Sequence, residues 1–223
     1  QDTRCWYYRD GRGLLADQGR MVIEGDNRFH AILGNRGPAK FVNPSRLAPA
    51  MISLGTRVRI VGPERDKEQI VDLESLFRTP TDEGQREHTI QPDQLLTHVI
   101  LPADRGRLSA TYEVRHGEGP DQPLAAAAVA MEVAYGVVQQ AKVVLGQVAP
   151  IPWIAPQAAH ALRGKPITEA SAQQAGLEAL SSATPLSQNE YKIQLAEVAV
   201  RRAILRATVI KREDAKHGLP SLI

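Results

Sequence analysis

The sequence predicts an α+β fold in which an antiparallel sheet precedes a group of helices. Residues before Trp153 show the alternation and short apolar runs of strands, whereas residues after it show helical spacing. The segment Ala141–Trp153 marks the change. It predicts a buried strand, apolar on both faces, that Pro150 and Pro152 end because proline has no N–H to donate. Strands followed by helices favour an antiparallel sheet.

The first half of the chain predicts short elements separated by turns. Ser45 fits a helix N-cap and Gly55 fits the helix end, so a helix is expected over 46–54. Its apolar residues at helical spacing predict one buried stripe: Leu47, Ala50, Met51 and Leu54. Strands are expected at 56–61, 68–73, 94–101 and 108–115.

The second half predicts a hairpin followed by three helices. Two apolar runs, 124–133 and 137–148, flank the turn Ala134-Tyr135-Gly136. The helices are expected at 155–162, 168–181, where Thr168 would be the N-cap, and 190–211. We therefore expect two units. Residues 1–120 would hold a mixed or antiparallel sheet with helices, and residues 121–223 a three-stranded antiparallel sheet with three helices.

Composition places the chain among ordinary globular proteins. Its 223 residues, of which 43% are hydrophobic and 23% charged, are enough for a sizeable core. A net charge of +2 and an aromatic content of 4% do not indicate a nucleic-acid or membrane surface. The single cysteine, Cys5, excludes an internal disulfide framework, and no apolar run reaches the ~20 residues of a membrane helix. We expect a cytoplasmic protein with no nucleic-acid partner and no membrane insertion.

The chain contains no familiar catalytic motif. It has no GxGxxG, P-loop or GxSxG sequence, and its six histidines show no metal-ligand spacing on one helix, so no catalytic or metal-binding residue is predicted. His30, in an apolar stretch, fits a satisfied core residue better than a ligand. Asp72 fits either a ligand contact at a strand end or a helix cap, and Ser45 fits either a cap or a phosphate contact.

Longer motifs in the second half resemble a known family. The run VVLGQVAPIPW at 143–153 is followed by Leu162-Arg163-Gly164-Lys165, then by Ala183–Lys192 and by Arg201-Arg202-Ala203. In this order they resemble the C-terminal domain of the FAD-binding (medium) subunits of molybdenum hydroxylases. These are the relatives of xanthine dehydrogenase, carbon monoxide dehydrogenase, 4-hydroxybenzoyl-CoA reductase and periplasmic aldehyde oxidoreductase.

The first half resembles the same family, and the similarity covers nearly the whole chain. Thr3–Arg9 and Asn27–Gly34 look like the family's stretches that lead into the second FAD-contacting segment. Asn43–Ala48 resembles the family's Pro-Ser-Asp-Leu-Ala, and Gln94–Pro102 resembles its strand beside the flavin ring. Residues 1–120 would then be part of the family's second FAD subdomain, and residues 121–223 its C-terminal domain.

Several features depart from the family pattern. In the family, the loop that cradles the FAD pyrophosphate belongs to an N-terminal subdomain without a counterpart here, and this chain has no Gly-Gly pair. Arg46 stands at the aspartate of Pro-Ser-Asp, Glu113 at a usual lysine and Gly117 at a usual arginine. Some members hold an extra iron–sulfur cluster with four cysteines in the region of residues 5–40. With Cys5 alone, this chain cannot form that cluster by itself.

The resemblance implies an electron-transfer subunit that binds FAD. In such a complex a molybdopterin-binding large subunit, carrying the molybdenum cofactor, oxidises the substrate. Electrons then pass through the [2Fe–2S] clusters of an iron–sulfur small subunit to FAD. The resemblance implies that Ser45 contacts the polar linker of the cofactor and that Asp72 accepts a hydrogen bond from it. Leu95 or Leu96 would form a wall of the flavin ring, and His30 and Ile32 would make further contacts.

A rival hypothesis belongs to another class, a flavin-free scaffold subunit that docks the molybdenum and iron–sulfur partners. The absent glycine loop and the charge changes at Arg46 and Glu113 favour it, whereas the C-terminal domain fits both hypotheses. An upstream Gly-Gly-Asn/Thr motif would favour the flavin subunit. The expected location is the cytoplasm, or the periplasm if a partner subunit carries an export signal.

Overall fold

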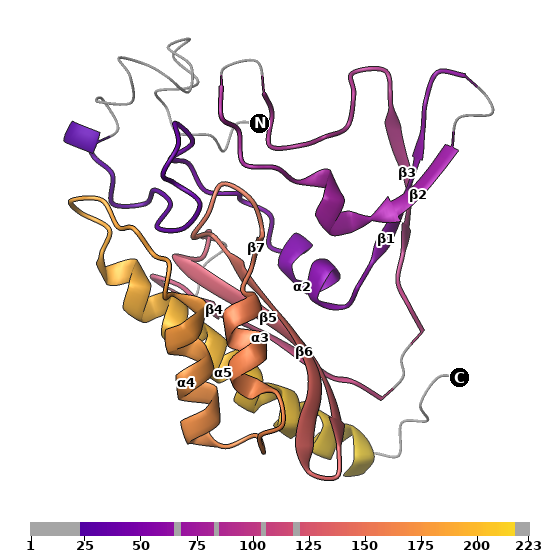
Figure 1. Ribbon diagram of the computed structural model, residues 1–223, viewed down its shortest axis with the longest axis vertical. Helices are drawn as coiled ribbons and strands as arrows, with labels where there is room; N and C mark the ends of the chain where they lie inside the picture. The colour runs from indigo at the N-terminus through magenta and orange to yellow at the C-terminus, as the bar shows by residue number, and fades with distance from the viewer. Residues whose placement is uncertain (1–22, 65–67, 83–84, 104–105, 118–120, 217–223) are drawn as a thin grey trace.

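A computed structural model of the chain describes residues 23–64, 68–82, 85–103, 106–117 and 121–216, with side chains up to residue 209 (Figure 1). The predicted α+β class is confirmed, since antiparallel sheets and helices both contribute to the fold. Cys5 and the motif Thr3–Arg9 lie outside the described residues.

The first sheet has the strand order β2–β1–β3 and is antiparallel. Strand β1 spans Arg57–Val61, β2 spans Glu68–Asp72 and β3 spans Leu95–Ile100. Helix α2 (Ala48–Ser53) precedes the sheet, and the 3-10 helix η3 (Leu73–Leu76) follows β2. Buried apolar side chains of these elements and of one residue from the second sheet form a small core: Ile52, Val58, Ile60, Leu73, Leu76 and Val144.

The second sheet has the strand order β4–β5–β6–β7. Its strands span Leu108–Val114, Ala125–Ala134, Val137–Gly146 and Trp153–Ile154. Three strands were expected here, and the fourth is the two-residue β7. It forms because the chain turns back after β6 and pairs Trp153 with Leu145.

The hairpin predicted around Tyr135 is confirmed. Strands β5 and β6 are joined by Tyr135 and Gly136, whose φ angles are +53° and +78°. Positive φ at both loop positions is the conformation of two-residue turns that match the twist of the flanking strands. Glycine tolerates this conformation without strain, which explains its position in the loop.

Three helices cover one face of the second sheet (Figure 1). They are α3 (Pro156–Leu162), α4 (Glu169–Ala179) and α5 (Tyr191–Lys216). The predicted N-cap of α4 is confirmed: Thr168 Oγ1 accepts a hydrogen bond from Ser171 N at 3.1 Å, and Ser171 Oγ accepts one from Thr168 N at 2.9 Å. The main core lies between the sheet and these helices, and small residues, largely alanine, let them approach closely.

Strand β6 is buried on both faces, as its sequence predicts. Val143 and Leu145 belong to the main core, whereas Val144 between them packs into the small core. Helix α2 lies on the same side of the sheet as the small core. A Cβ atom added to Gly146 would lie 3.0 Å from Cγ of Pro49 in this helix, so the glycine permits the close contact.

Helix α2 differs from its prediction in start and orientation. It begins at Ala48, and its buried residues are Ala48, Pro49, Ile52 and Ser53. The expected stripe, which began at Leu47, was wrong: Leu47 is 66% exposed. The helix packs Pro49 against Gly146 of β6 and Ile52 into the small core with Val144, and this orientation leaves Leu47 exposed.

Candidate functional site

The structure does not bring all predicted cofactor contacts together. Asp72 ends β2 and pairs with Arg57, whereas Leu95 begins β3 and pairs with Val61. Arg57 and Val61 are the two ends of β1, and four residues of strand span about 13 Å. Asp72 and Leu95 therefore lie at opposite ends of the first sheet.

Strand β3 presents apolar side chains to solvent at the edge of this sheet. Leu95 is 66% exposed, and Val99 and Leu101 are about half exposed. Leu96 is partly buried and packs against the small core. Of the two leucines predicted to wall a flavin ring, Leu95 is the one available for a ligand.

The structure gives Ser45 a local hydrogen-bonding role. Its hydroxyl accepts a hydrogen bond from Ala48 N at 3.0 Å, and its own N–H donates to Asn43 Oδ1 at 3.0 Å. Ser45 was expected at the N-cap position, which Leu47 occupies instead. The hydroxyl nevertheless satisfies an amide in the first turn of α2, which is the physical purpose of a cap.

Asp72 occupies the N-cap position of η3 without capping it through its side chain. Its backbone carbonyl accepts a hydrogen bond from the hydroxyl of Ser75 at 2.7 Å. The carboxylate is exposed and makes no hydrogen bond or ion pair with another described residue. Asp72 is thus available to a ligand at its end of the sheet.

His30 and Ile32 lie inside the molecule, in the loop before α2. Ile32 is fully buried in the main core. His30 is only 8% exposed, which agrees with the predicted core position, but neither ring nitrogen has a hydrogen-bond partner among the described residues. Burial, aided by the charge of Lys192, lowers the pKa of His30 to about 4. Its imidazole is therefore neutral at pH 7.

Polar side chains join this loop to the segment before α5. Asn27 Nδ2 donates to Ser187 Oγ at 2.9 Å, and Asn27 Oδ1 accepts from Gln188 N at 3.0 Å. Asn189 Nδ2 donates to the carbonyl of His30 at 3.1 Å. Both segments carry motifs that resemble the family. The structure shows that the two motifs, about 160 residues apart in the sequence, bind each other.

Lys192 is the most deeply buried charged residue of this contact. Its side chain is 2% exposed, and Nζ donates to the carbonyls of Gln147, Phe29 and His30 at 2.7, 3.1 and 3.2 Å. Burial lowers the pKa of Lys192 to about 7, while three carbonyl acceptors match the three donors of an ammonium group. The lysine ties the His30 loop, the end of β6 and helix α5 together.

The sequence does carry a signal for Lys192, although the prediction missed it. Helix α5 buries Ala196, Ala199 and Ala203, and Lys192 lies one helical turn before Ala196 on the same stripe. A lysine on the apolar face of a helix is unusual and indicates a buried acceptor set. The residues that would supply those acceptors are distant in sequence, so the partners themselves were not predictable.

An ion-pair cluster joins the loop before α2 to β4. Arg46 Nη2 lies 2.7 Å from Glu113 Oε2, and Arg46 Nε lies 2.8 Å from Glu113 Oε1. Arg115 pairs with the same carboxylate. Hydrogen bonds from Arg46, followed by those from Arg115, lower the pKa of Glu113 below its usual range.

A cavity of about 380 Å³ lies between the Lys192 contact and the segment that holds Ser45. Phe29 and Pro44, the chain neighbours of His30 and Ser45, contribute to its wall together with Lys192. Across the residues that the structure describes, no group of three or more His, Cys, Asp or Glu could hold a metal ion, and no helix is long and apolar enough to cross a membrane.

The chain is similar in sequence to known proteins. Residues 110–207 match the model of the CO dehydrogenase flavoprotein C-terminal domain. The aldehyde oxidoreductase FAD-binding subunit PaoB of Escherichia coli (strain K12) is 28% identical over 214 residues, which are 93% of this chain and 63% of that protein. The carbon monoxide dehydrogenase medium chain of Afipia carboxidovorans is 26% identical over 199 residues, 87% of this chain and 66% of that protein.

The predicted resemblance to the medium subunits of molybdenum hydroxylases is thereby confirmed, over a chain that spans about two thirds of these relatives' length. Solved structures share the fold of this chain. A cyanide-inactivated Cu,Mo-CO dehydrogenase gives a TM-score of 0.64 at 22% identity, covering 86% of this chain and 72% of that one. The quinoline 2-oxidoreductase of Pseudomonas putida 86 gives 0.62 at 20% identity, covering 83% and 59%.

Proposed function

We propose that the protein is the FAD-binding electron-transfer subunit of a multi-subunit molybdenum hydroxylase. The observation that carries the proposal is its similarity, over 93% of its length, to a protein named as an FAD-binding subunit of an aldehyde oxidoreductase. FAD, when bound, would supply the redox chemistry between iron–sulfur clusters and an external acceptor. The chain's own contribution would be to bind the flavin and to position it.

The described residues fit one part of such a cofactor. The exposed side chain of Leu95 offers an apolar wall to the flavin ring, and the carboxylate of Asp72 offers an acceptor at the other end of β1. An extended dinucleotide can reach both ends of the strand, whereas a compact ligand cannot. Ser45 and His30 do not belong to this sheet, and their chain neighbours Pro44 and Phe29 line the cavity beside Lys192. A glycine-rich phosphate cradle is not found among the described residues.

The proposed partners are a molybdopterin-binding large subunit with the molybdenum cofactor and an iron–sulfur small subunit with [2Fe–2S] clusters. The chain would consist of a partial FAD-binding unit followed by the family's C-terminal domain. The proposed division lies between residues 120 and 121. The family model begins at residue 110, and β4, which precedes this division, pairs with β5, which follows it. The proposed location is the cytoplasm, or the periplasm if a partner directs export.

A second candidate function is a flavin-free scaffold subunit of the same kind of complex. The observation that favours it is the separation of the predicted contacts: Asp72 and Leu95 lie at opposite ends of β1, and the side chain of Ile32 is fully buried. On this alternative the fold would serve to dock the partners.

The deciding experiment is an absorption spectrum of the protein purified with its native partners, before and after reduction with dithionite. An oxidised-flavin band near one equivalent per chain, bleached by dithionite, is the result expected for the FAD-binding subunit. Iron–sulfur absorption without flavin would overturn the first proposal and leave the scaffold function.

A further inference from the structure

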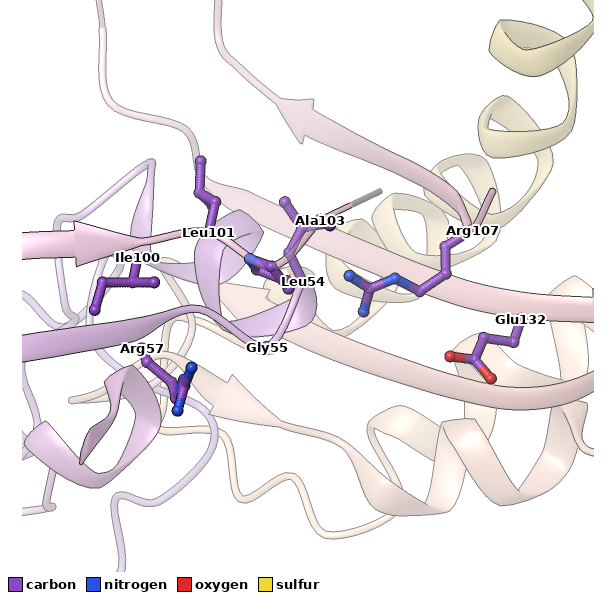
Figure 2. A pocket seen from close by; sticks show the side chains of 9 residues that line it. Leu54, Gly55, Arg57, Ile100, Leu101, Ala103, Arg107 and Glu132 are labelled. Carbon is purple, nitrogen blue, oxygen red and sulfur yellow. The ribbon is translucent and has the colours of Figure 1, made fainter. Parts of the chain in front are cut away.

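A second hollow, of about 490 Å³, lies between the two sheets at the end of β1 opposite to Leu95. Figure 2 shows Arg57 entering it from the first sheet, and Arg107 and Glu132 extending into it from the second. Its volume falls within the range of pockets that hold small molecules, roughly 300–1,000 Å³. None of the six predicted cofactor contacts contributes to its wall.

Arg57 turns into this hollow although a carboxylate is its direct neighbour in the sheet. Its cross-strand partner in the β1–β2 ladder is Asp72, and oppositely charged residues in that arrangement normally pair. Two positions further along β1, Arg59 does form an ion pair, with Glu68 of β2. The side chain of Arg57 makes no ion pair or hydrogen bond with another described residue.

On the opposite wall, Arg107 also faces the hollow instead of pairing with the neighbouring carboxylate. The β4–β5 ladder pairs Leu108 with Met131, so Arg107 and Glu132 face each other one position beyond this pair on the two strands. They nevertheless form no ion pair, and both side chains extend into the hollow (Figure 2). Two guanidinium groups thus face one space, each without the carboxylate that its strand neighbour would provide. Like charges held together in this way favour an anion between them.

We propose that this hollow binds the anionic group, a carboxylate or a phosphate, of a small molecule that also carries an apolar body. Guanidinium groups bind both kinds of anion through paired N–H donors. Among the described residues that line the hollow, two arginines and the single carboxylate of Glu132 leave an excess of one positive charge, which one monoanionic group neutralises. Ile100, Leu101 and Leu54 form the apolar part of the wall and would contact the apolar body. The proposal is independent of whether the protein binds flavin.

The test is isothermal titration of the purified full-length protein with benzoate, phenyl phosphate and inorganic phosphate at low salt. We expect saturable binding of at least one aromatic probe, and weaker binding of inorganic phosphate because it has no apolar body. Arg57→Gln and Arg107→Gln should each weaken binding by about tenfold or more, the usual loss for a charge-assisted hydrogen bond. Glu132→Gln should tighten binding, because it removes a like charge from the anion's site.

Arg206→Gln, an exposed arginine of α5, is the matched control and should leave the affinity unchanged. Circular dichroism confirms that each variant is folded. Comparing benzoate with phenyl phosphate identifies which anion the site prefers, and preference for either supports the proposal. Absence of saturable binding for both aromatic probes, or binding that survives Arg57→Gln and Arg107→Gln together, would overturn it.

Discussion

Arg46 and Glu113 form a bidentate ion pair although they are 67 positions apart in the sequence. The resemblance to the family predicts an aspartate and a lysine at these positions, so each residue departs from the expected pattern. The two departures are reciprocal, because they exchange the charges of one pair. The charge changes at Arg46 and Glu113 therefore lose much of their weight as an argument for a flavin-free subunit, since one structural contact accounts for both.

Exchanging the two charges of this pair should restore part of the stability that each single substitution removes. Arg46→Asp would place two carboxylates together, and Glu113→Lys would place three cations together, since Arg115 also contacts this site. Each single variant should lower the free energy of unfolding modestly, and Arg46→Asp with Glu113→Lys should recover part of the loss. A double-mutant cycle by urea denaturation at low ionic strength measures this coupling. Strictly additive losses would show that the pair does not act as one contact.

Lys192→Met should be among the more destabilising single substitutions in the chain. It leaves three buried carbonyl oxygens without their donor, at a cost of about 3 kcal/mol in the free energy of unfolding. Lys165→Met, at an exposed lysine, is the matched control and should change stability little. Chemical denaturation of both variants checks this. Equal stability of the two variants would mean that Lys192 is dispensable to the fold.

His30 should make the protein sensitive to mild acid. Its folded-state pKa of about 4 lies below the ordinary value of 6.5, so the unfolded chain binds more protons between these pH values. Its contribution to stability is complete above pH 6.5 and is lost as the pH falls through 4. Because lowering a pKa by one corresponds to about 1.4 kcal/mol, this contribution is a few kcal/mol in the free energy of unfolding.

A pH series of thermal unfolding measures this effect. His30→Phe should flatten the loss of stability between pH 6.5 and pH 4, whereas His98→Gln, at an exposed histidine, should retain the wild-type slope. An unchanged slope in His30→Phe would assign the acid sensitivity to other groups.

Gly176→Ala should weaken the contact between α4 and α5. A Cβ atom at Gly176 would lie 2.8 Å from the carbonyl oxygen of Glu197, which cannot move without shifting helix α5. The expected loss is about 1–3 kcal/mol, as for overpacking elsewhere. Gly37→Ala, whose added Cβ would meet nothing within 4 Å, should be tolerated. Thermal unfolding of the pair provides the comparison, and similar melting temperatures would contradict the close approach.

Leu95→Asp should reduce the flavin content of the purified complex if β3 forms the wall of the flavin site. A charge on that apolar surface disfavours a stacked ring. Tyr135→Asp, at the fully exposed hairpin turn, introduces the same charge elsewhere and should retain the flavin. The flavin-to-protein absorbance ratio is the measurement. Loss of flavin in Tyr135→Asp as well would point to a general effect of charge on assembly.

Some elements were predictable because their signals are local. The hairpin at Tyr135-Gly136 follows from two apolar runs and a glycine turn, and the cap of α4 follows from Thr168 itself. Strand β6 was predictable as doubly buried because both of its faces are apolar. The buried face of helix α2 was predicted wrongly, because it depends on the space that Gly146 leaves for Pro49, a contact between residues distant in the sequence.

The sequence by itself determined the α+β class, the order of strands and helices, and the family resemblance, since each depends on residue type and spacing along the chain. Only the tertiary structure decided which residues meet: Lys192 with the His30 loop, Arg46 with Glu113, and Asp72 apart from Leu95. The physical reason is that a buried lysine, an ion pair and a ligand pocket depend on groups that folding brings together. The sequence signal of such a group shows its chemistry but not its partner.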